Sequence, residues 1–347
     1  MAGVVRVPFR GFALIRAQVE RGEDNLRRVI PIKETPEEKV ERHMRDRVRK
    51  LQGEGADNNK NIVQRIHKLG LLLTDKKLTP QELCCLFWRV SLAVSHLPQP
   101  HRAKKDDAFQ PLHQYLPTQQ FLLSPAFETT TRYFYDRLDE PEFRNLTPLS
   151  HILGGLSYLT PPYYPTSIDP RHVGPSFINP PTIPLLSPRL STVLNSTFTS
   201  TISIFKNRTS SPSTLSNLET SINSFVRVVE SLSSLAPFNE DYVKLSLDSI
   251  VPLIQEISPF LVDSMAPYQL SSYALSLSKL SPTTPIDKNV FEKIEEKSLS
   301  LMPSFSPKQM ESLAYSFVKL SIPTDKIDEA IKQRLATLYV QLENYQI

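Results

Sequence analysis

Apolar residues recur every three or four positions along most of the chain, and this spacing predicts amphipathic helices. The first clear helix start is Thr35-Pro36-Glu37-Glu38. A capping threonine, a proline at the first helical position and a glutamate three residues after the cap form a capping box there. The stretch LTPQELCCLFWRVSL, which begins at Leu78, opens with the same signal. The helix predicted between these two carries four apolar residues on one face: Ile62, Ile66, Leu69 and Leu73.

An internal repeat lies near the C-terminus. Residues 265–281 and 305–321 align without gaps at an offset of 40 residues. The identical positions are Pro267/Pro307, Gln269/Gln309, Ser272/Ser312, Ala274/Ala314, Ser276/Ser316, Lys279/Lys319, Leu280/Leu320 and Ser281/Ser321. A short proline-containing turn and a second amphipathic helix follow each copy. Their apolar faces are Val290, Phe291, Ile294 and Leu299 in the first copy, and Ile327, Ile331, Leu335, Leu338 and Leu342 in the second.

Two helices in a unit of about 40 residues are typical of an α-solenoid. We therefore predict an all-α fold, an α-solenoid of helical-hairpin repeats of about 40 residues with a basic N-terminal arm and a proline-rich extended insertion. The residues predicted to be buried between helices are Leu270, Ala274, Leu277, Met310, Ala314 and Phe317. Ser124-Pro125 and Ser258-Pro259 are further candidate helix starts.

The predicted domain organisation has four parts. Residues 1–70 form the arm and first helices, and residues 71–159 the N-terminal helical repeats. A Pro/Ser/Thr-rich extended segment occupies 160–210, and the C-terminal helical-hairpin repeats occupy 211–347. Nine prolines between Thr160 and Arg189 exclude regular helix there. Aromatic residues are interspersed among them, so we expect this segment to lie along a surface.

The repeated phrase combines an apolar residue, Ser/Thr-Pro, Gln/Glu-Leu/Met and a Lys-Leu ending. It resembles the helical repeats of organellar RNA-binding proteins, namely the heptatricopeptide-type repeats of the FASTK/RAP-domain family and octotricopeptide repeats. The resemblance covers residues 265–342 best and residues 78–95 less closely. It implies a helical RNA-binding protein. Because the last predicted helix runs almost to Ile347, we expect no RAP domain and no RNA-cleaving role.

Charge is distributed unevenly along the chain. Residues 1–110 hold 22 Lys+Arg against 14 Asp+Glu, whereas residues 111–347 hold 18 against 22. A basic head on a mildly acidic body places candidate anion binding in the head. The candidate RNA-binding residues are Arg6, Arg10, Arg16, Arg27, Arg28, Arg42, Arg45, Arg47, Arg49 and Lys50, together with Lys279 and Lys319 at one repeat position. The alternative for the Arg42–Lys50 helix is a solvated face on which acidic residues alternate with the basic ones.

Catalytic and metal-binding motifs are not apparent. The seven histidines are scattered, no Gly-x-Ser-x-Gly elbow occurs, and the last of nine glycines is Gly174. Cys84 and Cys85 are neighbours, which we interpret as buried apolar residues rather than half of a zinc site. We interpret Trp88 as a core or interface anchor. The sequence therefore predicts a protein that is not an enzyme, with no cofactor, no metal and no small-molecule substrate.

The N-terminal nineteen residues carry Arg6, Arg10 and Arg16 and no acid, a pattern that favours mitochondrial (matrix) targeting or a retained basic arm. No apolar run is long enough for a membrane span. We expect a non-catalytic subunit of a mitochondrial ribonucleoprotein, most plausibly a mitoribosomal scaffold. Its partners would be RNA, chiefly ribosomal RNA, through the basic region, and neighbouring proteins through the repeats. The alternatives are a scaffold subunit of a respiratory or ATP-synthase complex and a free RNA-processing or RNA-stability factor.

Overall fold

The computed structural model describes residues 3–7, 15–21, 27–31, 35–53, 62–97, 116–159, 188–206, 214–235, 240–281 and 285–344. The chain divides into two compact units, Met1–His43 and Met44–Ile347. Within the described residues, no helix has an apolar stretch of the length and purity that crossing a membrane requires.

The first unit contains a three-stranded antiparallel sheet in the order β1-β2-β3. Its strands are β1 (Gly3–Val7), β2 (Ile15–Arg21) and β3 (Arg27–Pro31). Val5 pairs with Ala17, and Val19 pairs with Val29. The sequence predicted an extended arm for this region. The extended backbone is therefore confirmed in the described residues, but the pairing of the strands into a sheet was not predicted.

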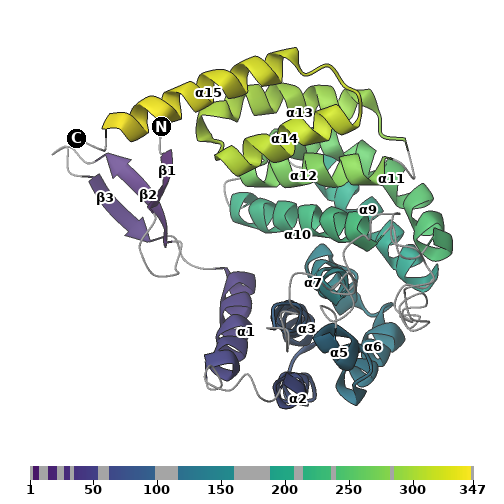
Figure 1. Ribbon diagram of the computed structural model, residues 1–347. Helices are drawn as coiled ribbons and strands as arrows, with labels where there is room; N and C mark the ends of the chain where they lie inside the picture. Colours follow the sequence, from purple (N-terminus) through teal and green to yellow (C-terminus); the bar gives the residue numbers. More distant parts are fainter. Residues whose placement is uncertain are drawn as a thin grey trace, which may run out of the picture. The chain divides into compact units, whose positions relative to one another are not determined.

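The second unit is helical throughout its described residues, which confirms the all-α prediction for this part of the chain. Figure 1 shows the thirteen α-helices that the structure describes. Those of the N-terminal half are α1 (Pro36–Gly53), α2 (Ile62–Leu73), α3 (Pro80–Ser95), α5 (Leu116–Leu122), α6 (Pro125–Arg137) and α7 (Leu146–Leu159). The others are α9 (Pro188–Lys206), α10 (Thr214–Leu235), α11 (Glu240–Val262), α12 (Pro267–Leu280), α13 (Lys288–Leu301), α14 (Pro307–Lys319) and α15 (Asp325–Asn344). Two short 3-10 helices, η1 (Pro141–Phe143) and η4 (Met302–Ser304), precede α7 and α14.

The predicted helix starts at 35 and 79 are confirmed by their hydrogen bonds. The Thr35 hydroxyl accepts from the Glu38 amide at 3.2 Å, and the Glu38 carboxylate accepts from the Thr35 amide at 3.0 Å. Thr79 and Glu82 form the same reciprocal pair at the start of α3. Ser124 caps α6 as predicted. Each cap provides partners for amide groups that the first helical turn leaves without one.

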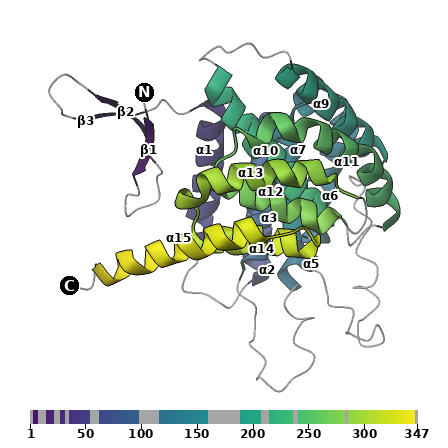
Figure 2. The ribbon, with the colours of Figure 1, turned by 90° about the horizontal axis from the view of Figure 1, so that it is seen from above.

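Nine of the described helices of the second unit follow each other in two rows, to which α2, α5 and α6 do not belong. In one row α3 packs on α7, α7 on α10, α10 on α12 and α12 on α14. In the other, α9 packs on α11, α11 on α13 and α13 on α15. Figures 1 and 2 show successive helices of the chain from α10 onward alternating between the rows. Each helix from α10 to α13 therefore has a neighbour on both sides within its own row.

Close packing between α3 and α7 depends on a glycine. A Cβ atom on Gly155 would lie only 2.5 Å from Cε1 of the Phe87 ring, so a larger residue there would displace the ring. Phe87 is fully buried and meets the ring of Phe134 edge-on at 5.4 Å. The two helices approach closely because this position has no side chain.

The Ser/Thr-rich residues after the proline-rich segment differ from the prediction. Residues 188–206 form helix α9, whereas the extended segment was predicted to continue to 210. The apolar residues of α9 lie at helical spacing and are buried: Leu190, Val193, Leu194, Phe198 and Ile202. Its hydroxyl groups bond to carbonyls of the preceding turn, as Thr199 does to Asn195 at 2.8 Å. Because serine and threonine hydroxyls can form hydrogen bonds to carbonyls of their own helix, an abundance of these residues does not exclude a helix. Residues 160–187 lie outside the described residues.

The prediction that Ser258-Pro259 begins a helix is wrong. Both residues lie inside α11, which also contains Pro252. The Ser258 hydroxyl donates to the carbonyl of Ile254 at 2.5 Å, as a residue within a helix can. The Ser-Pro pair alone therefore did not distinguish a helix interior from a helix start.

Burial in the repeat confirms most of the predicted core and corrects one residue. Leu270, Ala274, Leu277, Met310 and Phe317 are buried, each with at most 1 % exposed surface. Ala314 is only partly buried. It occupies the same position as Ala274, but α14 is the last described helix of its row. No described helix of that row therefore covers Ala314.

Candidate nucleic-acid interface

Pairing of the N-terminal strands arranges the predicted basic residues by face. Arg6 lies directly opposite Arg16 in the register, and Arg28 lies opposite Glu20. Directly paired residues share a face of a sheet, and alternate residues of a strand do so as well. Arg6, Arg16 and Arg28 therefore occupy positions on one face. Arg27 is on the other face, and Arg10 lies outside the described residues.

The opposite face of this sheet is mostly apolar by the same rule. Its positions are Gly3, Val5, Val7, Ile15, Ala17, Val19, Val29 and Pro31, with Arg21 and Arg27 at one end. The sequence alone did not reveal this alternation, because no strand there is longer than seven residues and the pairing could not be deduced. One face of the sheet thus carries the positions of Arg6, Arg16 and Arg28 together with Glu20, and the other is mostly apolar with Arg21 and Arg27 at one end.

The basic residues of α1 fall on two sides of the helix. Met44 and Val48 are buried and define its inner face. At 100° per residue, Arg42, Arg45 and Arg49 follow one flank of that face. Arg47 and Lys50 follow the other flank. Of these five residues, Arg42, Arg49 and Lys50 are exposed, and Arg45 and Arg47 are partly buried. The structure therefore does not gather the five residues into a single stripe.

Arg47 has a structural partner. Its guanidinium lies 3.0 Å from the carboxylate of Asp75, in the turn between α2 and α3. The Lys77 amide donates to the same carboxylate at 3.1 Å. This amide, together with the Arg47 guanidinium, holds the pKa of Asp75 below its usual value, so the pair stays ionised at neutral pH. Arg47 thereby joins α1 to the α2–α3 turn.

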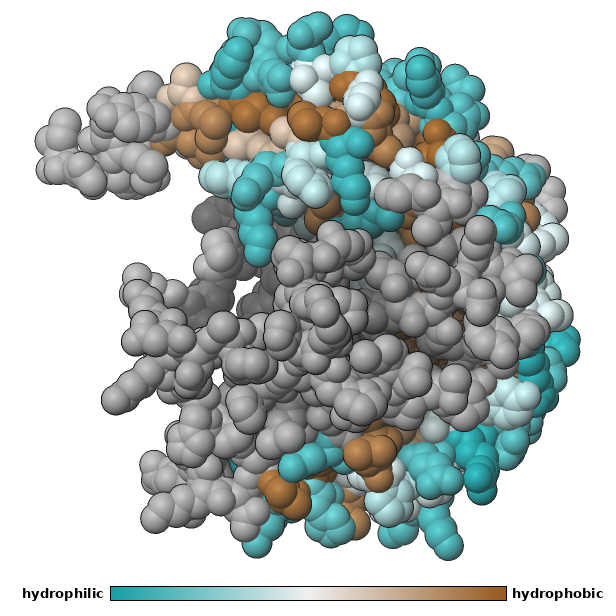
Figure 3. All heavy atoms as spheres, turned by 45° about the vertical axis from the view of Figure 1, so that its right-hand side comes forward, coloured by the Kyte–Doolittle hydropathy of each residue, from teal (hydrophilic) through white to brown (hydrophobic). Residues whose placement is uncertain are grey.

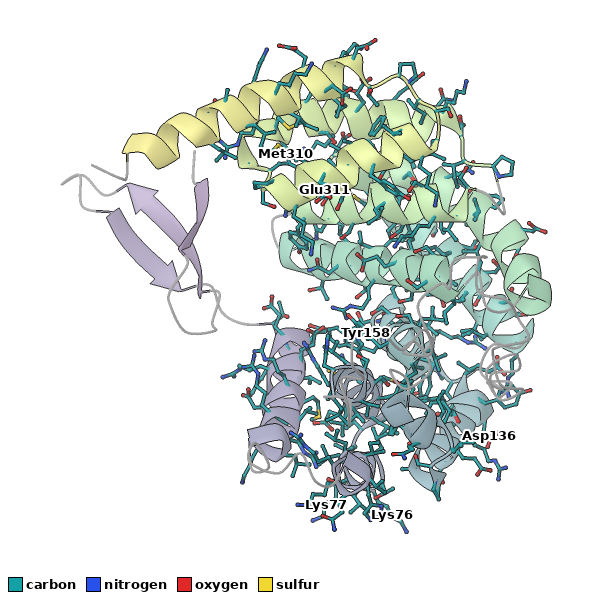
Figure 4. The ribbon with its side chains drawn as sticks, in the orientation of Figure 1. Lys76, Lys77, Asp136, Tyr158, Met310 and Glu311 are labelled. Atoms are coloured by element: carbon teal, nitrogen blue, oxygen red, sulfur yellow. The ribbon has the colours of Figure 1, made fainter. Side chains whose placement is uncertain are left out.

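This ion pair brings two further cations beside α1. Lys76 and Lys77 occupy the turn next to Asp75 and are exposed. In Figure 4 both point away from the helices. Lys50 lies three residues after Arg47 on α1 and is also exposed. Neither lysine was among the predicted RNA-binding residues, because only the Arg47–Asp75 contact shows that the turn lies against α1.

Lys279 and Lys319 occupy matching places on adjacent helices. Both are exposed, and both lie in the last turn of their helices, α12 and α14. A cation there favourably meets the partial negative charge of the helix C-terminus. This local role accounts for their recurrence, and contact with RNA is not needed to explain it.

Trp88 anchors a cationic stack that the sequence did not reveal. The His151 ring stacks on the indole at 5.2 Å. The guanidinium carbons of Arg89 and Arg227 lie 3.9 and 4.0 Å from the indole centroid. Cation–π contacts of this kind stabilise by about 0.5–2 kcal/mol. The indole is 8 % exposed and His151 is 1 % exposed, so groups from α3, α7 and α10 already occupy the site.

This arrangement explains why Trp88 is an anchor between helices. Gly154 also contributes, because a Cβ atom there would lie 3.2 Å from the indole ring. Arg227 is 139 residues from Trp88 in the sequence, and no pattern indicated that α10 would reach it. The interpretation of Trp88 as a core or interface anchor agrees with these contacts.

The described residues hold no cluster of three or more His, Cys, Asp or Glu side chains suited to a metal ion. Cys84 and Cys85 are not joined in a disulfide, and both are fully buried. Burial raises the pKa of the Cys84 thiol well above its ordinary value, so this thiol stays protonated and unreactive. The chemistry available on the basic surfaces is the neutralisation of anions, and the guanidinium group of arginine matches the geometry of both carboxylate and phosphate groups.

A scan of protein-family models and searches of curated proteins and of solved structures each find no match to this chain.

Proposed function

We propose that this chain is a non-catalytic, RNA- and protein-binding scaffold subunit of a mitochondrial ribonucleoprotein, most plausibly of the mitoribosome. Its N-terminal basic region contacts ribosomal RNA, and its helical rows contact neighbouring proteins. The observation that carries the proposal is the placement of Arg6, Arg16 and Arg28 on one face of the N-terminal sheet. A flat face with three arginines can meet several phosphates of a nucleic-acid backbone at once.

The two rows of helices support the scaffold part of the proposal. We infer that Met44–Ile347 is an α-solenoid in which α10–α11, α12–α13 and α14–α15 are successive hairpins. In such arrays each hairpin contacts only its neighbours, which produces long surfaces suited to binding other macromolecules. Polar side chains link the hairpins specifically: the Asn223 amide oxygen of α10 accepts from Tyr268 at 2.6 Å and from Gln269 at 2.7 Å.

Mitochondrial location is proposed from the arginines and the lack of acidic residues in the first nineteen positions. Targeting presequences are amphipathic helices, whereas residues 3–7 and 15–21 pair as strands. The strands favour a part of the protein that stays attached after import. Mass spectrometry of the N-terminus in the purified native protein tests this inference, because a retained arm yields peptides that contain Arg6 and Arg16.

The RNA contact is tested with the purified full chain and unrelated RNA oligonucleotides over a range of salt concentrations. Arg6, Arg10, Arg16, Arg27 and Arg28 are changed together to Gln. A plot of log K against log salt falls as salt increases. Each lost phosphate contact should make this fall less steep, by about 0.7–0.9 in the slope. All RNA sequences should be affected alike, because backbone contacts position the protein without reading bases.

A matched control removes five positive charges from the C-terminal helices by changing Lys288, Lys293, Lys297, Lys332 and Arg334 to Gln. We expect its RNA affinity and salt slope to match those of the parent. If the arginine variant binds as tightly as the parent with the same slope, the N-terminal region is not the RNA contact. If the native complex purifies without RNA, the proposal fails in favour of a scaffold subunit of a respiratory or ATP-synthase complex.

A further inference from the structure

The outward face of α14 includes residues at repeat positions that are buried on α12. On α12, which packs on α14, Ser271, Ala274 and Ser278 are buried. The residues 40 positions later are Glu311, Ala314 and Val318. Glu311 is exposed, Ala314 is partly buried and Val318 is 64 % exposed. Where α12 receives another helix, the described part of α14 has no neighbour in its row.

Beside these positions, α14 carries further exposed surface that has no covered equivalent on α12: the counterpart of Tyr315 is Leu275, which is partly buried, and that of Lys319 is Lys279, which is exposed. Val318 and Tyr315 are 64 % and 54 % exposed. On α15, the last helix of the other row, Leu335 is 45 % exposed. Figure 3 shows hydrophobic side chains gathered over the C-terminal helices. Contiguous exposed apolar side chains on a folded protein commonly mark an interaction surface.

Charged residues flank this apolar surface symmetrically. Glu311 lies four residues before Tyr315, and Lys319 lies four residues after it. All three are exposed and follow one stripe of α14, because residues four apart are neighbours on a helix surface. Met310, the residue beside Glu311, lies in the core instead (Figure 4). From Glu311 to Lys319 the stripe reads negative, aromatic, positive at equal spacing, and the exposed Lys308 lies three residues before Glu311 on the same side of the helix.

We propose that α14 binds the α14 of a second copy of this chain, antiparallel, with a two-fold axis at Tyr315. In that arrangement each Glu311 opposes the Lys319 of the other copy, and the two Tyr315 rings meet at the axis. Val318 of each copy opposes Ser312 of the other and is removed from water. A two-fold interface requires a self-complementary surface, and the order of these three residues provides one.

The symmetry of the charges is the reason for choosing a second copy as the occupant. A helix of a different protein would need no equal spacing of opposite charges around one aromatic residue. Burial of Val318 and Tyr315 supplies the driving force. The ion pairs act mainly on orientation and specificity, because exposed pairs contribute little energy. The proposal does not depend on RNA binding.

Sedimentation velocity of the full RNA-free chain over a wide concentration range tests the proposal. The parent should form a dimer. Glu311→Lys places like charges opposite each other at two points, so we expect the dissociation constant to rise about tenfold or more. Glu311→Lys combined with Lys319→Glu restores both pairs in reversed order, so the constant should return to within about threefold of the parent.

Two further variants make the test specific. Val318→Ser introduces the residue that α12 carries at this position, and it should weaken the dimer without unfolding the chain. Lys288→Glu changes the charge of an exposed residue on α13 and should leave the dissociation constant unchanged. Far-UV circular dichroism verifies that each variant is folded. A parent that stays monomeric, or a dimer that Glu311→Lys does not weaken or that the double variant does not restore, overturns the proposal.

Discussion

Helices α12 and α14 have closely similar sequences but bury different parts of their surfaces. One stripe is buried in both: Leu270, Tyr273 and Leu277 on α12 and their counterparts Met310, Leu313 and Phe317 on α14. A second stripe is buried only on α12, where α14 covers it. The same positions on α14 lie at the end of the row. Burial in a repeat is therefore a property of the neighbours as much as of the residue.

The residue types have adjusted to this difference. Ser271 and Ser278 on α12 are small and buried. At the corresponding positions α14 carries Glu311 and Val318. Ala274 and Ala314 are identical, yet only Ala274 is fully buried. Identity at an aligned position therefore does not guarantee the same environment.

The largest expected effect comes from the shared core stripe. Leu277→Ala removes a fully buried side chain and should lower the free energy of unfolding by roughly 2–5 kcal/mol. Leu335→Ala, at a residue that is 45 % exposed, should cost well under that range. Urea unfolding followed by circular dichroism measures both changes. Equal losses in the two variants would show that the last helix is packed as tightly as α12.

The second stripe provides the most direct test of the comparison. Ala274→Leu should overpack the α12–α14 contact and destabilise the chain by roughly 1–3 kcal/mol. Ala314→Leu adds the same atoms at the aligned position but has open space on one side, so its cost should stay within about 0.5 kcal/mol. The same urea unfolding experiment measures the change in the free energy of unfolding for both variants. A larger loss for Ala314→Leu than for Ala274→Leu would contradict the burial pattern.

A third difference concerns Tyr273, whose counterpart on α14 is Leu313. Its hydroxyl hydrogen-bonds with the Ser258 hydroxyl, and burial raises the pKa of Tyr273 far above its usual value. The folded chain therefore holds this proton more tightly than the unfolded chain, in which tyrosine ionises near pH 10. The resulting stability is fully present below about pH 10 and is lost as the pH rises further.

Tyr273→Phe should cost about 0.5–1.5 kcal/mol at neutral pH, because the Ser258 hydroxyl keeps only its bond to Ile254. Above about pH 10 the variant should lose less stability with rising pH than the parent, since it has no proton to release there. Urea midpoints at pH 7 and at several values above 10 measure this. Parallel pH profiles for the two proteins would exclude Tyr273 as the source of alkaline sensitivity.

The smallest effects are expected at the helix starts. Ser306 and Gln309 form a complete capping box on α14. At the matching position of α12, Ala266 has no side-chain acceptor, and only the bond from its amide to Gln269 is made, at 2.7 Å. Ser306→Ala should cost about 1 kcal/mol, and Ala266→Ser should stabilise by up to about the same amount. Thermal unfolding of the two variants tests whether Ser306→Ala lowers the stability and Ala266→Ser raises it.

Local signals in the sequence determined the helices of this protein. Thr35, Thr79 and Ser124 each precede a proline and cap a helix, because capping needs only the hydroxyl and the next three residues. The buried stripe around Leu270 and Leu277 followed from spacing of 3.6 residues per turn. Such signals depend on a few neighbouring residues, so they could be found without knowing the rest of the fold.

Tertiary structure decided which contacts these helices make. Trp88 meets Arg227 and His151, and Lys76 lies beside α1, only because helices distant in the sequence pack together. The exposure of Val318 likewise depends on where the row of helices ends. Sequence periodicity defines the apolar face of a helix, but which part of that face is covered depends on the neighbours that long-range packing provides.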